Sequence, residues 1–135
     1  IWPLDHCPPH VTAVCRADDW TARFEFSMVT RDVSLWDIKP RQNAPTFATI
    51  KRLAGQVDKN LSVCRDAWWR LQQTVCLDNA PVRRLGKEVV VLPPGDAGEG
   101  TVVKGSGAYF SGQGVQARVD WGSSVTVEWL KEMPA

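Results

Sequence analysis

Long apolar stretches are missing from this sequence. Its 135 residues contain no run of 18 apolar residues, so no helical membrane span is expected. Hydrophobic residues make up 44% of the chain and charged residues 23%, which is typical of a globular protein with one domain or two small ones. The chain begins at Ile1 and not at Met, as expected if it was trimmed or if a leader was removed.

Histidine is scarce as well, and familiar catalytic motifs are absent. The chain has only His6 and His10, both near its beginning, and it holds no G-x-S-x-G elbow, Walker loop or H-E-x-x-H sequence. The glycines between Gly105 and Gly114 neither follow a strand nor open a helix, so we interpret them as turn residues and not as a dinucleotide-binding loop. The sequence therefore favours a protein without catalytic activity, and it predicts no cofactor.

Cysteine is too sparse for a disulfide scaffold. The four residues, Cys7, Cys15, Cys64 and Cys76, permit two disulfides in three pairings. Cys64 and Cys76 fall in a predicted helix, where they would lie roughly 120° apart around the axis and roughly 18 Å apart along it. A continuous helix would keep these two from bonding to each other. Buried free thiols are the expected state.

One group of residues near the start of the chain has the composition of a metal site. His6, Cys7, His10 and Cys15 are of the types that bind zinc. Their spacing, H-C-x2-H-x4-C, matches no zinc finger arrangement, and no C-x2-C pair accompanies them. These four residues are weak candidate ligands, and the sequence predicts no metal.

Charge is spread unevenly along a chain whose net charge is only +1. Residues 1–30 carry 2 basic and 4 acidic side chains, residues 31–87 carry 11 and 5, and residues 88–135 carry 3 and 6. The basic middle segment could attract a polyanion. A solvated helix face gives the same composition, so nucleic-acid binding through residues 31–87 is an alternative interpretation.

The first part of the chain predicts a β-hairpin. Three prolines make residues 1–10 an extended lead-in. Residues 11–15 predict a strand, and the strict alternation of residues 20–28 predicts a second one with a single buried face. Residues 30–45 are expected to form an irregular connection, because two prolines interrupt them. The expected buried face consists of Ala22, Phe24, Phe26 and Met28.

Two amphipathic helices are predicted next. Apolar residues recur at spacings of three and four over residues 47–57, with Asn43 and Thr46 as candidate N-caps. A second apolar stripe covers residues 64–75, with Ser62 as its cap. The short polar break between the two stripes predicts a helical hairpin.

From residue 86 the pattern changes to short strands separated by glycine-rich turns. Four to five such strands in under fifty residues predict a small antiparallel barrel. Residues 130–133 can close it with one helical turn. The predicted strands cover residues 89–92, 101–104, 115–121 and 125–129.

The order of these features is similar to that of a known group of barrels. A G-x-V second strand begins at Gly100, a long glycine-rich loop follows, and an alternating third strand ends at Trp121. A tight turn at Gly122 and a closing leucine, Leu130, complete the pattern. This segment resembles the SH3-like barrels of the KOW, Mind-bomb and CAP-Gly kind. The resemblance implies a fold for residues 86–134, and residues 1–85 resemble no family.

Adjacent tryptophans supply a first candidate contact site. Trp68 and Trp69 lie side by side on the second predicted helix, so their side chains point roughly 100° apart. Trp68 continues the apolar stripe, whereas Trp69 lies beside Arg65 and Arg70 on the expected wet face. An exposed tryptophan near arginines is typical of an interface anchor or of a base-stacking platform. Trp69 could instead cover another part of the chain.

The glycine-rich loop of the barrel supplies the second candidate. Residues 105–114 carry Tyr109 and Phe110 side by side, and ten residues are more than a hairpin connection needs. The two aromatic side chains are therefore expected to hold something. An outside partner is favoured over the predicted helices.

These observations predict an α+β protein with two parts. Residues 1–85 form a hairpin and a two-helix region, and residues 86–135 form an SH3-like barrel. The expected function is that of a non-catalytic binding module or accessory subunit of a larger assembly. It would contact a protein partner through the barrel loop and an exposed helix face. The alternatives are nucleic-acid binding and a small enzyme with an unrecognised pocket.

Overall fold

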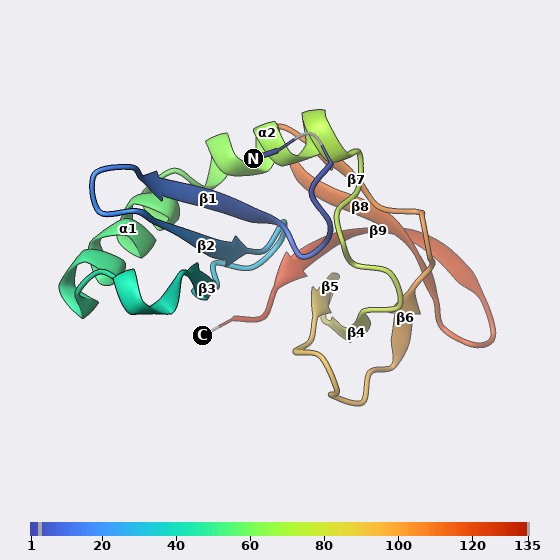
Figure 1. Ribbon diagram of the computed structural model, residues 1–135. Helices are drawn as coiled ribbons and strands as arrows, with labels where there is room; N and C mark the ends of the chain where they lie inside the picture. Colours follow the sequence, from blue (N-terminus) through green and yellow to red (C-terminus); the bar gives the residue numbers. More distant parts are fainter. Residues whose placement is uncertain (3, 135) are drawn as a thin grey trace. The chain divides into compact units, whose positions relative to one another are not determined.

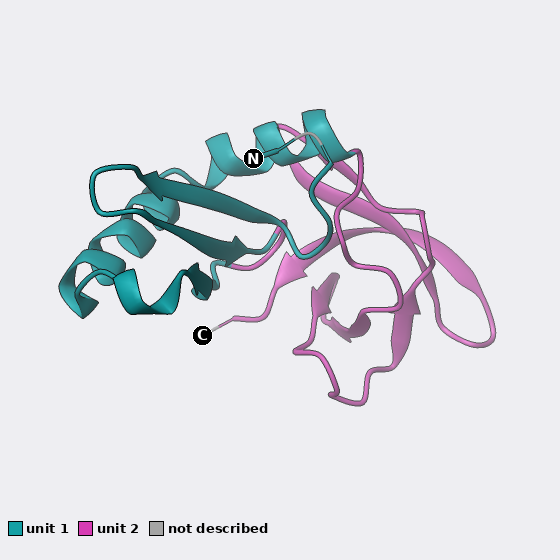
Figure 2. Cartoon of the chain, in the orientation of Figure 1, with its two compact units in different colours: residues 1–27, 31–72 teal, residues 28–30, 73–135 magenta. Residues whose placement is uncertain are grey.

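The computed structural model describes residues 1, 2 and 4–134, so Pro3 of the predicted lead-in and Ala135 of the predicted barrel domain lie outside the described residues. The chain forms two compact units (Figure 2). Unit 1 consists of residues 1–27 and 31–72, and unit 2 of residues 28–30 and 73–135. A three-stranded sheet and two helices precede a closed β-barrel, which confirms the predicted α+β class (Figure 1).

Unit 1 contains an antiparallel sheet in the order β1-β2-β3. The predicted hairpin of β1 (His10–Cys15) and β2 (Trp20–Phe26) is confirmed. Strict alternation along β2 turns one face of the strand into the core. As predicted, Ala22, Phe24, Phe26 and Met28 are all buried.

The third strand, β3 (Val33–Lys39), shows that the expectation of an irregular connection over residues 30–45 was wrong. Its register against β2 pairs Phe24 with Leu35 and Arg23 with Asp37, so Trp36 is the extra residue of a β-bulge. A bulge shifts the alternation of side chains by one residue. The sequence of β3 therefore lacks the period of two that marks β2.

Both predicted helices are present in unit 1. They are α1 (Phe47–Lys59) and α2 (Leu61–Gln72), with Asn60 alone between them. The hydroxyl of Thr46 accepts a hydrogen bond from the backbone N–H of Thr49 at 3.3 Å, which confirms Thr46 as the N-cap of α1.

Three details of the helical region differ from the prediction. Asn43 lies in a short 3-10 helix, η1 (Arg41–Asn43), and donates its amide to the carbonyl of Asp19 at 2.8 Å instead of capping α1. Ser62 lies inside α2 and so does not cap it. α2 ends at Gln72, short of the predicted end at residue 75, because Gln73 takes a φ of 54° that a right-handed helix cannot continue.

The barrel of unit 2 is a ring of five strands. Its neighbours follow the order β4-β5-β9-β8-β6, and β6 pairs back with β4. All pairs are antiparallel except β5 with β9. This small closed barrel is compatible with the SH3-like resemblance. The strands are β4 (Pro81–Leu85), β5 (Glu88–Val91), β6 (Gly100–Val102), β8 (Gly114–Asp120) and β9 (Val125–Glu132).

Some boundaries in the barrel differ from the prediction. The expected loop of residues 105–114 contains a sixth strand, β7 (Ala108–Phe110), which pairs with β8 after a three-residue turn. Residues 130–132 continue β9 and do not form a helical turn. β4 was not predicted, because Pro81 was interpreted only as the end of a helix.

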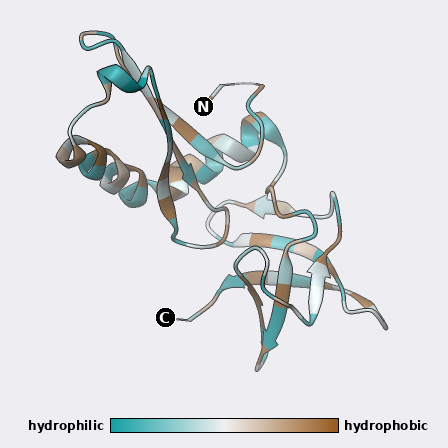
Figure 3. Cartoon of the chain, turned by 60° about the horizontal axis from the view of Figure 1, so that its bottom comes forward, coloured by the Kyte–Doolittle hydropathy of each residue, from teal (hydrophilic) through white to brown (hydrophobic). Residues whose placement is uncertain are grey.

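Alternating side chains fill the barrel. Banding of polar and apolar residues along its strands is visible in Figure 3. Gly100 begins β6 where its backbone lies close to Asp120 and Trp121. A Cβ atom on Gly100 would lie 2.7 Å from the Trp121 ring and 2.9 Å from the carbonyl oxygen of Asp120. The buried barrel residues include Val82, Val89, Val102, Val115, Ala117, Val119 and Leu130.

The cysteines divide into two kinds. Cys15 and Cys64 are free thiols, whereas Cys7 and Cys76 are disulfide-bonded, so the expectation of free thiols was wrong for the latter two. The sequence placed Cys76 in a helix that continues from Cys64. In the structure α2 ends at Gln72, and Cys76 has a φ of 58°, so Cys76 is not helical. Burial raises the pKa of the Cys64 thiol above its ordinary value.

Among the residues that the structure describes, no helix is both long enough and apolar enough to cross a membrane.

Candidate protein-binding face

The outer side of the β7–β8–β9 sheet carries an exposed apolar surface. Along β9, Thr126, Glu128 and Leu130 turn inward, while the residues between them turn outward. We call the set of outward apolar residues the outer face. It consists of Phe110 from β7 and of Val125, Val127 and Trp129 from β9, all of which are exposed.

Two aromatic rings form the centre of the outer face. Phe110 is 41% exposed and Trp129 is 37% exposed, and their ring centroids lie 5.6 Å apart in an edge-on arrangement. They come from strands on either side of β8. The residue of β8 directly opposite Phe110 is Gly114, which has no side chain to separate the rings. Paired aromatic rings that remain accessible are typical of interface anchors.

A polar column lies beside this apolar one. Gln116, Arg118 and Asp120 of β8 stand opposite Trp129, Val127 and Val125 of β9, and residues that stand opposite one another share a side of the sheet. Arg118 is exposed and has no ion pair with any residue in the described part of the chain. The outer face therefore lies beside an available cation, Arg118.

A polar cluster on the inner side of β9 fixes which residues turn outward. The indole of Trp121 donates to the Thr126 hydroxyl at 2.8 Å, and that hydroxyl donates to Glu128 at 2.6 Å. Arg84 donates to the same carboxylate oxygen at 3.0 Å and lies 5.0 Å from the centre of the Trp121 ring. This chain of bonds joins β4 to both arms of the β8–β9 hairpin.

The same contacts set the charge of Glu128. The hydrogen bond from Thr126 lowers the pKa of this carboxyl, and the bond and charge of Arg84 act in the same direction. Partial burial opposes the shift but does not cancel it. Glu128 is thus held as an anion on the inner side of β9.

The structure separates the two aromatic residues predicted for the barrel loop. Both lie on β7, where neighbours point to opposite sides of the sheet. Tyr109 is only 8% exposed and belongs to the core, whereas Phe110 belongs to the outer face. Burial of Tyr109 speaks against its contact with an outside partner, and the same expectation for Phe110 stays a prediction.

The helical candidates lie in unit 1, whereas Phe110 lies in unit 2. Trp68 is fully buried, as predicted, with Phe26 at 6.4 Å and His10 at 5.4 Å between ring centroids. Trp69 is half-buried and Arg70 is exposed. Arg65 is half-buried and donates from Nε to the carbonyl of Ser27 at 2.8 Å. This arginine has a structural contact inside its own unit.

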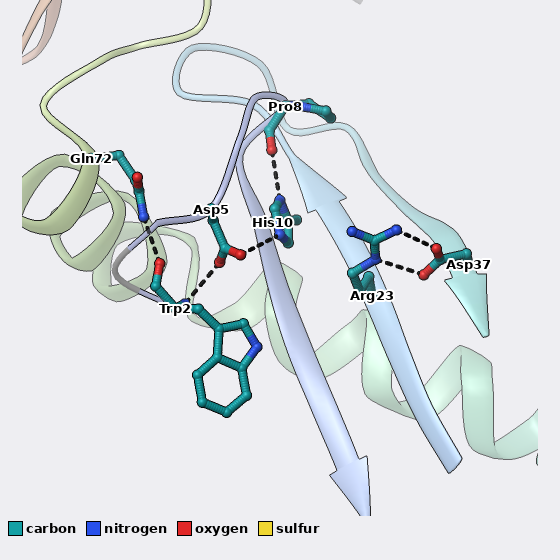
Figure 4. A network of polar contacts seen from close by, with 7 residues as sticks. All are labelled: Trp2, Asp5, Pro8, His10, Arg23, Asp37 and Gln72. Atoms are coloured by element: carbon teal, nitrogen blue, oxygen red, sulfur yellow. Dashed lines mark hydrogen bonds and ion pairs between the residues drawn. The ribbon is translucent and has the colours of Figure 1, made fainter. Parts of the chain in front are cut away.

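One of the weak metal candidates, His10, has polar contacts within unit 1. Figure 4 shows His10 between two acceptors: Nδ1 lies 2.8 Å from the Pro8 carbonyl oxygen and Nε2 lies 3.3 Å from the Asp5 carboxylate. Asp5 also accepts from the Trp2 backbone at 2.8 Å, and Gln72 of α2 donates to the Trp2 carbonyl.

No group of three or more histidine, cysteine, aspartate or glutamate residues that could hold a metal ion occurs within residues 1, 2 and 4–134. His6, Cys7, His10 and Cys15 are thus not brought together as a ligand set.

A second ionic contact lies on the sheet of unit 1, also drawn in Figure 4. Arg23 pairs with Asp37 across β2 and β3 through two hydrogen bonds, one of 2.8 Å from Nε, and its guanidinium lies 4.0 Å from the centre of the Trp36 ring. The Arg23 bond lowers the pKa of Asp37, and the same bond raises that of Arg23. This network stabilises the bulged register of β3.

Unit 1 also contains an open cleft of about 550 Å³. Cys15 donates weakly to Asp18 at its rim, at 3.7 Å, and Thr46 and Thr49 are occupied in the cap of α1. Arg52 contributes a cation, and no histidine lines the cleft, all of whose wall residues are described. The wall of this cleft therefore lacks the cysteine–histidine pair by which a thiol nucleophile is commonly activated.

Sequence reasoning missed three of the four residues of the outer face. The alternation of residues 125–129 predicts a strand but does not show which side of that strand faces solvent. One signal was present: Leu130, the expected closing residue, has the opposite parity to Val125, Val127 and Trp129. An inward Leu130 requires that these three turn outward.

Comparison of the chain with protein-family models, with curated proteins and with solved structures gives no match.

Proposed function

We propose that this chain is a non-catalytic binding module that takes a protein partner on the outer face of its barrel. The observation that carries the proposal is the accessible pair of Phe110 and Trp129, flanked by Val125 and Val127. The barrel core is filled by other residues, so these four are not needed to complete it. Contiguous apolar area rimmed by polar side chains is typical of protein interfaces.

The charges favour a protein over a nucleic acid. Binding of a polyanion needs several available cations on one face. Among the described residues of β8 and β9, this side offers two exposed ones, Arg118 and Lys131, beside the acidic Asp120. The basic segment of residues 31–87 is divided between the two units. Some of its cations also have partners, since Arg84 binds Glu128, Arg65 binds the Ser27 carbonyl and Lys39 lies 4.0 Å from Asp37.

A comparison of variants tests the proposal. The double variant Phe110→Ser, Trp129→Ser removes the aromatic centre, and Val63→Ser changes an equally apolar, exposed position on α2 in unit 1. Each protein is immobilised and exposed to extract of its native cells, and retained proteins are quantified by mass spectrometry. Circular dichroism verifies that both variants are folded.

The expected result is a set of proteins retained by the wild type and by Val63→Ser but lost by the double variant. That retention should persist at high salt, because apolar contacts are not screened. Equal retention by the double variant would contradict the proposal. Recovery of nucleic acid with a steep salt dependence would favour the alternative instead.

A further inference from the structure

The cleft of unit 1 has two walls that come from separate parts of the sequence. One wall belongs to the β1–β2 hairpin and includes Asp18 and Trp20. The other belongs to the start of α1 and includes Thr49 and Arg52. The volume of about 550 Å³ lies within the range of roughly 300–1,000 Å³ that is typical of sites for small molecules. The cleft is therefore large enough to hold one.

Hydrogen bonds hold the two walls in place. Asn43, which also lines the cleft, donates its side-chain amide to the Asp19 carbonyl at 2.8 Å and so ties the segment before α1 to the hairpin turn. The Thr46 hydroxyl caps α1 by accepting from the backbone N–H of Thr49 at 3.3 Å. Since these contacts form without a ligand, little ordering of the walls would oppose binding.

Trp20 carries a hydrogen-bond donor that the protein leaves unused. Its side chain belongs to a residue that is only 7% exposed, yet the indole N–H bonds to none of the described residues. Within the same part of the chain, the Thr12 hydroxyl is the one fully buried side-chain polar atom without a partner, so the Trp20 N–H still reaches solvent. Buried tryptophans usually find a partner for this group. Because Trp20 lines the cleft, a ligand there can supply it.

Two opposite charges line the cleft without pairing. Neither Asp18 nor Arg52 forms an ion pair with any residue in the described part of the chain, although both line the same cleft. Asp18 accepts only the weak bond from the Cys15 thiol at 3.7 Å. Both side chains are exposed, so their charges are available to a ligand.

Each wall favours one sign of charge. The dipole of α1 places partial positive charge at its amino end, where Thr46 and Thr49 lie, and the first turn of α1 has no acidic residue to offset it. Arg52 adds a full positive charge to this wall. The hairpin wall carries the Asp18 carboxylate instead. A ligand with a single charge is attracted by one wall and repelled by the other, whereas a ligand with both charges is attracted by both.

We propose that this cleft binds a free α-amino acid, with its carboxylate toward Arg52 and its ammonium group toward Asp18. A guanidinium group suits a carboxylate, because its N–H donors can bond to both oxygens. Ala44 and Pro45 give the wall an apolar part for the side chain of the ligand. This site lies within unit 1, whereas the outer face lies in unit 2, so it does not depend on the function proposed for that face.

NMR titration of the full chain at neutral pH, with L-leucine as the probe, tests the proposal. The indole N–H signal of Trp20 should move with leucine concentration and saturate, while that of Trp121 in unit 2 should not move. Two analogues each lack one charge: isocaproate has no ammonium group, and isoamylamine has no carboxylate. Leucine should bind about tenfold or more tightly than either, because each analogue loses a hydrogen bond between charged groups.

Variants of the two charged residues assign each charge of the ligand to its wall. Asp18→Asn should weaken leucine binding about tenfold but should not weaken isocaproate binding. Arg52→Gln should weaken leucine binding to a similar extent but should not weaken isoamylamine binding. Arg16→Gln and Asp58→Asn are the matched controls, since both change exposed charges of the same turn and helix outside the cleft, and both should bind leucine as the wild type does.

The spectra of the variants also verify that they are folded, so a loss of binding is not mistaken for a loss of structure. Three results would overturn the proposal. These are a Trp20 signal that does not saturate with leucine, equal affinities of the wild type for the three compounds, and leucine binding that is unchanged in both Asp18→Asn and Arg52→Gln.

Discussion

The neighbouring residues Tyr109 and Phe110 offer a direct test of how the barrel is built. Each is replaced by alanine in turn, at adjacent positions of one strand. Tyr109 is almost fully buried, so its truncation leaves a cavity and removes most of its transfer free energy. Comparable truncations of buried aromatic residues cost about 3–5 kcal/mol. We expect Tyr109→Ala to fall within this range.

Phe110→Ala should lower the free energy of unfolding far less than Tyr109→Ala does. The ring is 41% exposed. Its truncation therefore loses about three fifths of the roughly 1.5–3 kcal/mol of transfer free energy that a fully buried ring contributes. Water fills the vacated space, and no enclosed cavity forms. The expected cost is therefore about 1–2 kcal/mol, including the contact with Trp129. At about 3–4 °C per kcal/mol, the midpoint of thermal unfolding should fall by about 10 °C or more for Tyr109→Ala and by about 3–8 °C for Phe110→Ala.

The assay must report on unit 2, because two units can unfold in separate transitions. Trp121 and Trp129 are the two tryptophans of unit 2, and the other five belong to unit 1. Fluorine NMR of protein labelled with 5-fluorotryptophan follows each indole separately through the melt. Equal losses for the two variants, or a greater loss for Phe110→Ala, would refute the assignment of Tyr109 to the core and Phe110 to the surface.

Three further predictions concern other parts of the chain. Gly100→Ala should lower the free energy of unfolding by about 1–3 kcal/mol in urea titrations, because the new methyl group meets Trp121 and a fixed carbonyl oxygen; unchanged stability would contradict the close approach. Glu128 has a lower pKa in the folded chain than its ordinary 4.5, so its stabilising effect is complete above that value and is lost as the pH falls through the folded pKa. Glu128→Gln should therefore flatten the loss of stability in acid, and urea titrations at several pH values measure this. Cys76→Ser should lower stability by about 2–4 kcal/mol, and alkylation of the unreduced, unfolded wild type should modify two cysteines, against four after reduction.

Local sequence patterns predicted the regular elements of the fold well. The alternation of Phe24 and Phe26 marked β2, and Thr46 marked the start of α1, because a strand period and a capping hydroxyl are both properties of a few neighbouring residues. The strands β5, β6, β8 and β9 were recognised for the same reason. These features do not depend on distant parts of the chain.

The errors came from interactions between distant residues. The bulge at Trp36 is defined only by its pairing with β2, so β3 looked irregular. The disulfide bonding of Cys7 and of Cys76 was missed, because no pattern in the residues around either cysteine marks it. The candidate site was partly predicted, since Phe110 was identified. Trp129 was missed, because the side of a strand that meets water is decided by its neighbours in the closed barrel.

The parallel pairing of β5 with β9 has a consequence for synthesis on the ribosome. Val89 of β5 pairs with Leu130 of β9, which lies 41 positions later in the chain. The ring of strands therefore cannot close until β9 has left the ribosome. Until then β4 and β5 form a nascent hairpin whose valines are uncovered and whose edge lacks its neighbour. Contacts of such long range form late and leave intermediates that are prone to aggregate. Codons that slow translation after β6 would prolong this exposed state, and a chaperone that holds extended apolar segments would be needed most during that interval.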